Sequence, residues 1–337
     1  MISISIDRAP RFIILGVQKC GTTALYDYLC LHSKVRRAQS KETHYFDWRL
    51  ESAKRARLSE SQRALLSRWG AESPCFEAQR AEMGPEDAHI HGAYRLLFPL
   101  EELLADPGLV SGEATPSYLL MGRPVAERIA RHAPDARFVV AVRDPVKRAY
   151  SQYNMTRDPV GTPAQLQRRG FAELGDRSFD QVVDEELRAI RDAGITAESS
   201  NDAFQAFLDS VPWRSDGGFH GGHSWLLRGL YALQMRIFLE FFPPEAFCVV
   251  ELEDLAADPL SVMFRIHRHL GIEEEPLPAS ELVPKNARSY QALSAKEQEL
   301  TEFYQPFAQK WEEMCLKYGW KVRSSENSSS SSSSSSS

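Results

Sequence analysis

A short segment near the start of the sequence combines glycines, a lysine and hydroxyl groups at spacings suited to a phosphate group. The sequence predicts a strand over 11–17 that breaks into a glycine-rich turn, followed by a helix over 22–31. A helix start offers unpaired backbone N–H groups, and glycine lets that backbone approach an anion closely. Lys19 adds a full positive charge, and Thr22 and Thr23 add hydroxyl donors. The segment is therefore a candidate phosphate-binding loop.

The sequence of this loop is similar to the nucleotide-triphosphate loop GxxxxGK[ST], except that its lysine stands at a different position. Gly16 and Gly21 have its glycine spacing, and Thr23 stands at its Ser/Thr position. Its lysine, which reaches the terminal phosphates, is replaced by Thr22, and the lysine of this chain lies inside the turn at Lys19. A small-molecule kinase with a degenerate loop, a non-catalytic nucleotide-binding scaffold and a plain glycine turn are the alternatives that this difference leaves open.

A second candidate anion site follows a buried-type strand predicted over 137–143. Arg143 ends that strand, at the edge where ligands bind in open α/β sheets. Ser151 lies about two turns along the next predicted helix, 145–155, and can face the same cleft. An arginine fork and a hydroxyl suit a phosphate monoester. The alternative is a surface pair of Arg143 and Asp144 beside a helix cap.

The remaining pattern predicts an α/β fold of three layers, a parallel sheet covered by helices on both faces, because strands alternate with crossover helices. Further strands are expected at 110–113 and 247–251, and further helices at 125–132, 179–193, 226–242, 258–270 and 295–317. The stretches 51–99 and 156–222 are polar and less regular, and we expect them to be insertions that build an acceptor cleft. The glycine-rich stretch 217–222 is expected to be a lid or a plain loop.

Composition and charge narrow the class of protein. Lys and Arg number 40 and Asp and Glu 46, so the net charge of -6 argues against a nucleic-acid partner. The apolar run 12–17 is far shorter than the ~20 residues that a bilayer requires, and no signal peptide is visible. We therefore expect a cytoplasmic protein, with the Golgi lumen as the alternative if an N-terminal anchor is missing from the sequence. A single domain is expected over 1–323, with a disordered serine-rich tail over 324–337.

A metal site is not expected. The five cysteines are far apart and form no CxxC pair. His89 and His91 would make a metal pair on a strand, but no third ligand is apparent in the sequence. The aromatic residues Tyr45, Phe46 and Trp48 are expected in the core rather than on a sugar-binding surface.

The loop and the Arg143 block together resemble the cytosolic and Golgi sulfotransferase superfamily, which uses 3′-phosphoadenosine 5′-phosphosulfate (PAPS). The resemblance implies a P-loop-like phosphosulfate-binding loop and no metal. It assigns the 3′-phosphate to Arg143 and Ser151. Lys285 and Arg288 stand at the family's late Gly/Lys/Arg-rich phosphate stretch. The loop residues that it assigns to the 5′-phosphosulfate are Lys19, Cys20, Gly21, Thr22 and Thr23.

A third block narrows the resemblance to the branch of the heparan sulfate 3-O-sulfotransferases and N-sulfotransferase domain. Residues 41–47 (KETHYFD) resemble their KE-x-H-[FY]-F segment, and 112–118 (GEATPSY) resemble EKTPAY, with Ala114 in place of the lysine. The similarity runs from about residue 11 to 320. It implies that Glu42 is the general base and that His44 orients the acceptor or the sulfonate. Lys19 would neutralise charge on the transferred group.

The resemblance therefore implies sulfuryl transfer from PAPS to an acceptor hydroxyl or amine on a carbohydrate. The kinase and the inactive nucleotide-binding scaffold remain the alternatives from the residues themselves.

Overall fold

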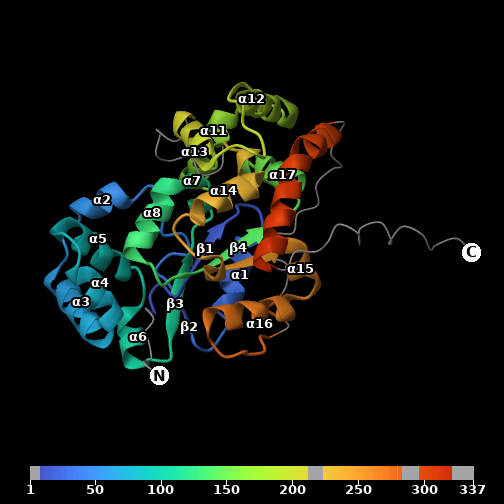
Figure 1. Ribbon diagram of the computed structural model, residues 1–337. Helices are drawn as coiled ribbons and strands as arrows, with labels where there is room; N and C mark the ends of the chain where they lie inside the picture. Colours follow the sequence, from blue (N-terminus) through green and yellow to red (C-terminus); the bar gives the residue numbers. More distant parts are fainter. Residues whose placement is uncertain (1–7, 212–222, 279, 283–295, 321–337) are drawn as a thin grey trace, which may run out of the picture.

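The computed structural model describes residues 8–211, 223–278, 280–282 and 296–320, and its centre is a five-stranded sheet. All strand pairs are parallel, in the order β2-β3-β1-β4-β5 (Figure 1). The strands are β1 (Phe12–Gly16), β2 (Val35–Arg37), β3 (Val110–Ala114), β4 (Arg137–Val142) and β5 (Phe247–Glu251). The predicted α/β fold with a parallel sheet is confirmed.

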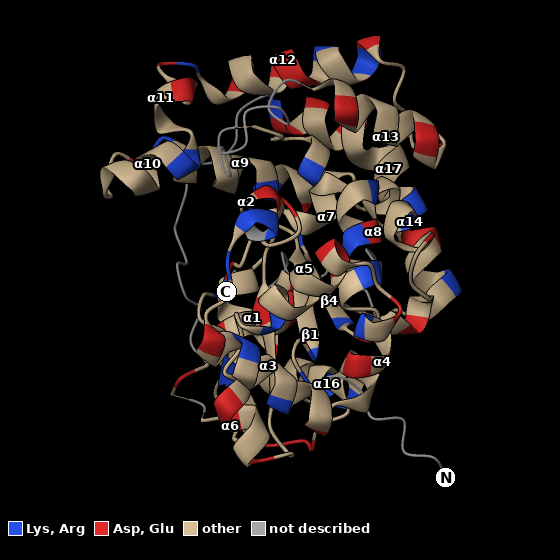
Figure 2. Ribbon diagram, turned by 90° about the vertical axis from the view of Figure 1, so that its left-hand side faces the viewer, with Lys and Arg blue, Asp and Glu red and all other residues tan. Residues whose placement is uncertain are grey.

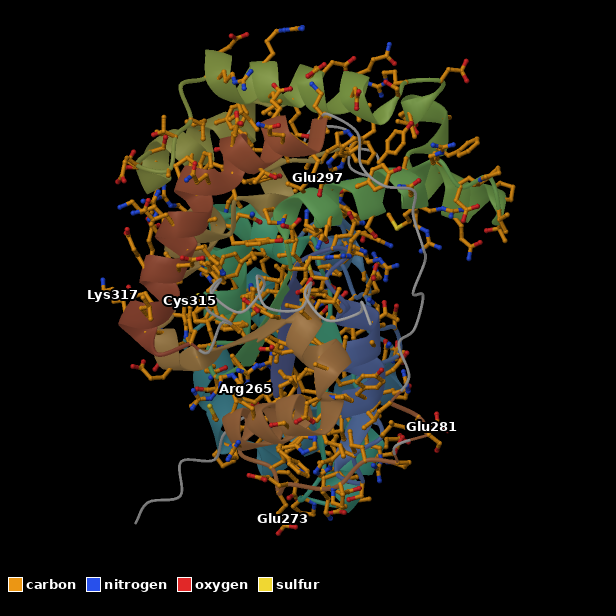
Figure 3. The ribbon with its side chains drawn as sticks, turned by 90° about the vertical axis from the view of Figure 1, so that its right-hand side faces the viewer. Arg265, Glu273, Glu281, Glu297, Cys315 and Lys317 are labelled. Carbon is orange, nitrogen blue, oxygen red and sulfur yellow. The ribbon has the colours of Figure 1, made fainter. Side chains whose placement is uncertain are left out.

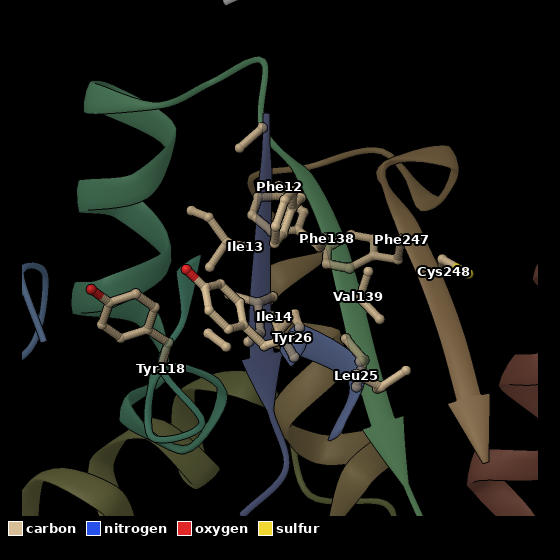
Figure 4. Packing of buried hydrophobic residues seen from close by; sticks show 14 of the residues in the cluster. Phe12, Ile13, Ile14, Leu25, Tyr26, Tyr118, Phe138, Val139, Phe247 and Cys248 are labelled. Carbon is tan, nitrogen blue, oxygen red and sulfur yellow. The ribbon is translucent and has the colours of Figure 1, made fainter. Parts of the chain in front are cut away.

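The central strands are apolar along their whole length because both faces of the sheet are covered. Every residue of β1 is buried, and Phe12 pairs in register with Gly112 on β3. A Cβ at Gly112 would collide with Phe12, so only glycine fits at this point. Figure 4 shows the apolar residues of β1, β4 and β5 packed together with residues of the helix that follows β1, among them Phe12, Phe138, Phe247, Leu25 and Tyr26.

Helices lie on both faces of the sheet (Figure 1). One face carries α1 (Thr22–Leu29), α15 (Leu252–Ala257) and α16 (Pro259–Leu270), which contact β1, β4 and β5. The other carries α7 (Tyr118–Met121), α8 (Arg123–His132) and α14 (Tyr231–Phe238). Helix α16 begins as predicted, because the Asp258 side chain caps it by accepting from the Ser261 N–H at 3.1 Å.

A second hydrophobic cluster lies among helices above the sheet, separate from the cluster around the strands. It is built by α9 (Pro145–Thr156), α11 (Phe171–Leu174), α12 (Phe179–Asp192), α13 (Asn201–Ser210) and α17 (Lys296–Tyr318). Helix α14 contributes to both clusters, with Tyr231 and Met235 in the first and Leu233 and Ile237 in the second. Figure 3 shows α17 along the outer side of the molecule, with Cys315 and Lys317 in its last turns.

The described parts of the two stretches expected to be less regular, 51–99 and 156–211, are largely helical, so that expectation was wrong, whereas the helix predicted within the second stretch, 179–193, is confirmed as α12. Residues 51–99 hold most of α2 (Leu50–Arg55), then α3 (Glu60–Glu72), α4 (Pro74–Ala81) and α5 (Pro85–Arg95), and α6 (Leu100–Ala105) follows. Residues 156–222 hold α10 (Pro163–Arg169) as well as α11 to α13. Basic and acidic residues are interspersed along these polar helices (Figure 2).

Three other expectations differ from the structure. The prediction did not include the edge strand β2. The helix expected over 226–242 is a 3-10 turn, Leu227–Gly229, followed by the shorter α14, and a second 3-10 turn, Pro244–Ala246, precedes β5. His89 and His91 lie on helix α5 and not on a strand. Residues two apart on a helix point in different directions, so they do not form the metal pair that was considered.

Several expected features lie outside the described residues: the glycine-rich stretch 217–222, the serine-rich tail over 324–337, and the side chains of Lys285 and Arg288. Within the part of the chain that the structure describes, no helix is long and apolar enough to cross a membrane.

Candidate active site

Among the candidate site residues, Lys19, Glu42, His44 and Arg143 lie in segments that leave the sheet at one edge. Because the strands are parallel, their carboxyl ends meet at the same edge, where open α/β sheets bind ligands. The turn after β1 carries Lys19, and Arg143 directly follows β4. The segment 41–47 lies at the same edge of the sheet, because the Ala114 N–H, at the end of β3, donates to the Lys41 carbonyl at 2.8 Å.

The candidate phosphate-binding loop turns into α1 at a glycine, as the sequence suggests. Gly21 is the N-cap residue of α1 with a φ of 83°, and no side chain of the described residues caps the helix start. A Cβ at Gly21 would lie 2.7 Å from Leu252 Cδ1, so a larger residue would both strain the backbone and meet α15. Thr22 is buried and Thr23 is exposed at the helix start. The first-turn N–H groups, which have no intrahelical acceptor, thus lie beside both hydroxyls.

Buried side chains contact the loop and the segment that follows β4. Arg148 donates to the Gln18 carbonyl at 3.4 Å and to Gln152 Oε1 at 2.8 Å. The Tyr231 hydroxyl donates to the Arg143 carbonyl at 2.8 Å and lies 4.0 Å from Cys20 Sγ. Burial raises the pKa of the Cys20 thiol to about 12, so its side chain is a neutral packing group under the loop.

Arg143 and Ser151 lie where the second anion site is predicted. Arg143 Nη1 is 3.4 Å from the Lys19 carbonyl, which brings this arginine to the phosphate-binding loop. Its Nε is buried and has no hydrogen-bond partner among the described residues, so it retains donor capacity for an anion. Asp144 caps α9 by accepting from the Lys147 N–H at 2.7 Å. Ser151 is buried two turns further along that helix.

Glu42 and His44 form one charged network. Glu42 Oε1 lies 2.7 Å from Lys41 Nζ, and Glu42 Oε2 lies 3.5 Å from His44 Nε2. On the other side of the imidazole, His44 Nδ1 is 3.0 Å from Asp47 Oδ2. Ser117 Oγ donates to the same Asp47 oxygen at 2.7 Å. The structure thus joins the two predicted residues through contacts that also include Asp47, to which the sequence analysis gave no role.

The charges around His44 favour its protonated form. Burial opposes protonation, but the carboxylates of Asp47 and Glu42 outweigh it and raise the pKa of His44 to about 9. At neutral pH the imidazolium and Lys41 therefore place two cations against Glu42. Cationic neighbours favour the ionised carboxylate, which is the form that a general base needs.

A fully buried carboxylate anchors this segment to the sheet. Glu113 Oε2 accepts from Thr43 Oγ1 at 2.7 Å and from Thr115 Oγ1 at 2.5 Å, and Glu113 Oε1 accepts from the Tyr94 hydroxyl at 2.6 Å. Burial raises the pKa of Glu113, and these hydrogen bonds partly offset that effect. Since Thr43 lies between Glu42 and His44, Glu113 fixes the backbone that carries both. The sequence block 112–118 contained this residue, but its burial had no signal in the sequence.

The aromatic residues of the segment divide between two environments. Tyr45 and Phe46 are buried, as expected for core residues. Trp48 is only half-buried and stacks on His44.

His91 is fully buried against Phe76, with ring centroids 4.7 Å apart. Among the described residues, no group of three or more His, Cys, Asp or Glu side chains is placed to hold a metal ion.

We expect the stability of the protein to depend on pH through His44. The ordinary pKa of histidine is 6.5 and that of folded His44 is about 9, so its ion pairs stabilise the fold fully below pH 6.5 and are lost as pH rises through 9. Asp47→Asn removes one of the two carboxylates and should flatten this dependence. The measurement is the free energy of unfolding in urea between about pH 6 and 10. Asp106→Asn, at an exposed ion pair, is the control that keeps the wild-type slope; equal slopes for wild type and Asp47→Asn would contradict the assignment.

Comparison with known proteins shows the family of the chain. A sequence model described as the sulfotransferase family matches residues 10–189, and one described as a sulfotransferase domain matches residues 116–313. Heparan sulfate glucosamine 3-O-sulfotransferase 6 of Homo sapiens is 27% identical over 267 residues, which is 79% of this chain and 53% of that protein. Carbohydrate sulfotransferase 15 of Homo sapiens is 25% identical over 328 residues, which is 88% of this chain and 52% of that protein.

The chain thus spans about half the length of these curated relatives. Among solved structures, a sulfotransferase from Alicyclobacillus acidocaldarius has the same fold, with a TM-score of 0.54, 22% identity and coverage of 93% of this chain and 97% of that one. The first family model alone matches more than half of the chain. The chain belongs to the sulfotransferase family.

Proposed function

We propose that this chain transfers a sulfuryl group from PAPS to a hydroxyl, or an amine, of a carbohydrate. The observation that carries the proposal is the placement of a phosphate-binding loop and the Glu42–His44–Asp47 network at one edge of the sheet in a sulfotransferase-family chain. The carbohydrate class is supported by the relatives, which are a heparan sulfate glucosamine 3-O-sulfotransferase and a carbohydrate sulfotransferase.

The donor would be held by residues of two segments. The start of α1 with Lys19, Thr22 and Thr23 would hold the phosphosulfate, since it offers N–H groups, hydroxyls and a cation. Arg143 and Ser151 would hold the 3′-phosphate, and the buried Arg143 Nε without a partner among the described residues supports this assignment. Lys285 and Arg288 are proposed for the same phosphate from the resemblance alone.

Glu42 would take the proton of the acceptor hydroxyl as its oxygen attacks sulfur. The new O–S bond forms while the bond from sulfur to the bridging phosphate oxygen breaks. Lys41 and protonated His44 keep the Glu42 carboxylate ionised and oriented before the reaction. Lys19 would stabilise the negative charge that develops on the departing oxygen.

The test of the proposal is ligand stabilisation followed by turnover. Adenosine 3′,5′-bisphosphate should raise the melting temperature without magnesium, because a ligand at a hundredfold excess over its dissociation constant stabilises by ~2.7 kcal/mol. Sulfate transfer from PAPS to a panel of saccharides should then proceed in the presence of a chelator. A shift that appears only with ATP and magnesium would favour the kinase. Binding of the bisphosphate without transfer to any acceptor would favour the inactive scaffold.

The variant Arg143→Ala should show which end of the donor Arg143 binds. If Arg143 holds the 3′-phosphate, the variant should bind adenosine 3′,5′-bisphosphate much more weakly and adenosine 5′-phosphosulfate, which lacks that group, almost unchanged. A hydrogen bond to a charged group contributes roughly 1.5–3 kcal/mol. Isothermal calorimetry measures both affinities. Equal weakening of the two ligands would place Arg143 elsewhere than at the 3′-phosphate.

A further inference from the structure

The half-buried indole of Trp48 lies directly on the imidazole of His44. The two ring centroids are 4.1 Å apart and the ring planes differ by 17°, so the rings are stacked face to face. The backbone N–H of Trp48 donates to Asp47 Oδ1 at 2.6 Å, which holds the carboxylate that contacts His44. The Trp48 side chain also packs against the hydrophobic cluster of the sheet. The indole therefore connects the core to the charged network.

The two carboxylates alone do not fix the His44 ring. Glu42 and Asp47 contact Nε2 and Nδ1, two nitrogens on different sides of the ring. Because the ring is also bonded to Cβ, its remaining freedom is rotation about the Cβ–Cγ bond, which would lengthen these contacts, and the contact with Glu42 is already 3.5 Å long. A stacked indole blocks that rotation toward one face, and its π electrons attract a protonated imidazole.

We propose that Trp48 is a positioning residue for His44: its indole holds the imidazolium in the plane in which it contacts both Glu42 and Asp47. This inference rests on the proposed function, because it gives His44 the task of orienting the general base. Trp48 thus acts on the reaction through His44 and not through contact with the donor. The role differs from the core position that the sequence alone suggests.

Other charged and polar groups face the same network, and a substitution of Trp48 removes none of them. Lys41 pairs with Glu42, and Ser117 of the segment before α7 donates to Asp47. Arg228, fully buried, interacts electrostatically with Glu42 and Asp47. Arg128 on α8 donates to the Phe46 carbonyl at 2.6 Å and interacts electrostatically with Asp47. Since the Trp48 side chain carries no charge, a substitution there changes none of these interactions directly.

The experiment compares Trp48→Leu with Trp48→Phe. Leucine keeps an apolar cover over the imidazole but has no π electrons, whereas phenylalanine keeps a ring. The pKa of His44 is followed by NMR in the ligand-free protein, with its resonance assigned from a His44→Asn variant. Tyr45→Phe is the matched control, because it removes only the hydroxyl that donates to the Ile90 carbonyl in the same segment.

We expect Trp48→Leu to lower the pKa of His44 by about 0.5 to 1.5, and Trp48→Phe to lower it less. With PAPS and an acceptor, kcat of Trp48→Leu should fall by roughly tenfold or more while donor affinity is unchanged. As pH rises and His44 loses its proton, kcat should fall. In Trp48→Leu this fall should begin at a lower pH than in the wild type. Tyr45→Phe should match the wild type in both measurements.

Two results would overturn the proposal. One is an unchanged pKa of His44 in Trp48→Leu. The other is a raised acceptor KM at unchanged kcat, which would make Trp48 a sugar-binding surface. The NMR titration needs neither PAPS nor an acceptor. A protein that transfers no sulfate therefore refutes the proposed function, whereas an unmoved His44 pKa refutes the role of Trp48.

Discussion

Glu42→Gln is expected to bind adenosine 3′,5′-bisphosphate as the wild type does and to turn over ~10²–10⁴ times more slowly. Glutamine keeps the shape of the side chain but cannot take the proton from the hydroxyl of the acceptor. It also removes the negative charge between Lys41 and His44, which lie 2.7 Å and 3.5 Å from the two carboxylate oxygens. Calorimetry measures binding, and transfer from PAPS to a working acceptor measures turnover.

Glu51→Gln is the matched control for this variant. Glu51 is exposed and pairs with Lys54 on α2, a short distance along the chain from Glu42, so its loss should change neither binding nor turnover. Near wild-type turnover of Glu42→Gln would make Glu42 a structural partner of Lys41. His44 would then be the next candidate for the base.

Glu113→Ala is expected to have the largest effect on stability. Removing this carboxylate leaves the hydroxyls of Thr43, Thr115 and Tyr94 buried without their acceptor. Each unsatisfied buried group costs ~1–3 kcal/mol, so the free energy of unfolding should fall by roughly 3–5 kcal/mol. Because Thr43 carries the segment of Glu42, turnover should fall as well, even at temperatures where the variant is folded.

Urea denaturation measures the fall in the free energy of unfolding of Glu113→Ala. Glu312→Ala, at an exposed position on α17, is the control. A Glu113→Ala variant as stable as the control would show that the buried hydroxyls find other acceptors. The anchoring role of Glu113 would then be wrong, whatever the variant does to turnover.

The strands and helices with strong apolar patterns could be predicted from the sequence. The runs that became β1, β4 and β5 are continuous and apolar because both faces of the sheet are covered. The strand β2 has no such run, since two of its three residues are arginines at the edge of the sheet. Charged residues are typical of edge strands, and they remove the hydrophobic signal.

Other differences arose from contacts between distant parts of the chain. The helix expected over 226–242 is interrupted near its start, where distant side chains bond to the backbone: Glu186 on α12 accepts from the N–H groups of Leu226 and Leu227, and Tyr304 on α17 donates to the Leu226 carbonyl. No local pattern reveals these partners. In contrast, α3 had a readable start, the capping box of Ser59 and Gln62, which the sequence analysis overlooked.

The placement of the candidate site could be predicted for the residues that lie in recognisable motifs. Lys19, Glu42, His44 and Arg143 stood in blocks that resemble a family, and the structure places each at the same edge of the sheet. Glu113 is recognisable only in three dimensions, because its function depends on burial and on hydroxyls that lie up to 70 residues away in sequence.

Helix α14 has consequences for the exchange of amide hydrogens with solvent. Its residues divide between the cluster around the sheet and the cluster of helices, so neither cluster can open without exposing one of its faces. The amides of α14 must therefore exchange mainly when the whole protein unfolds. Tyr231, at its first position, also donates to the Arg143 carbonyl beside the candidate phosphate-binding loop. A ligand that stabilises this loop makes global unfolding rarer, and with it exchange throughout both clusters.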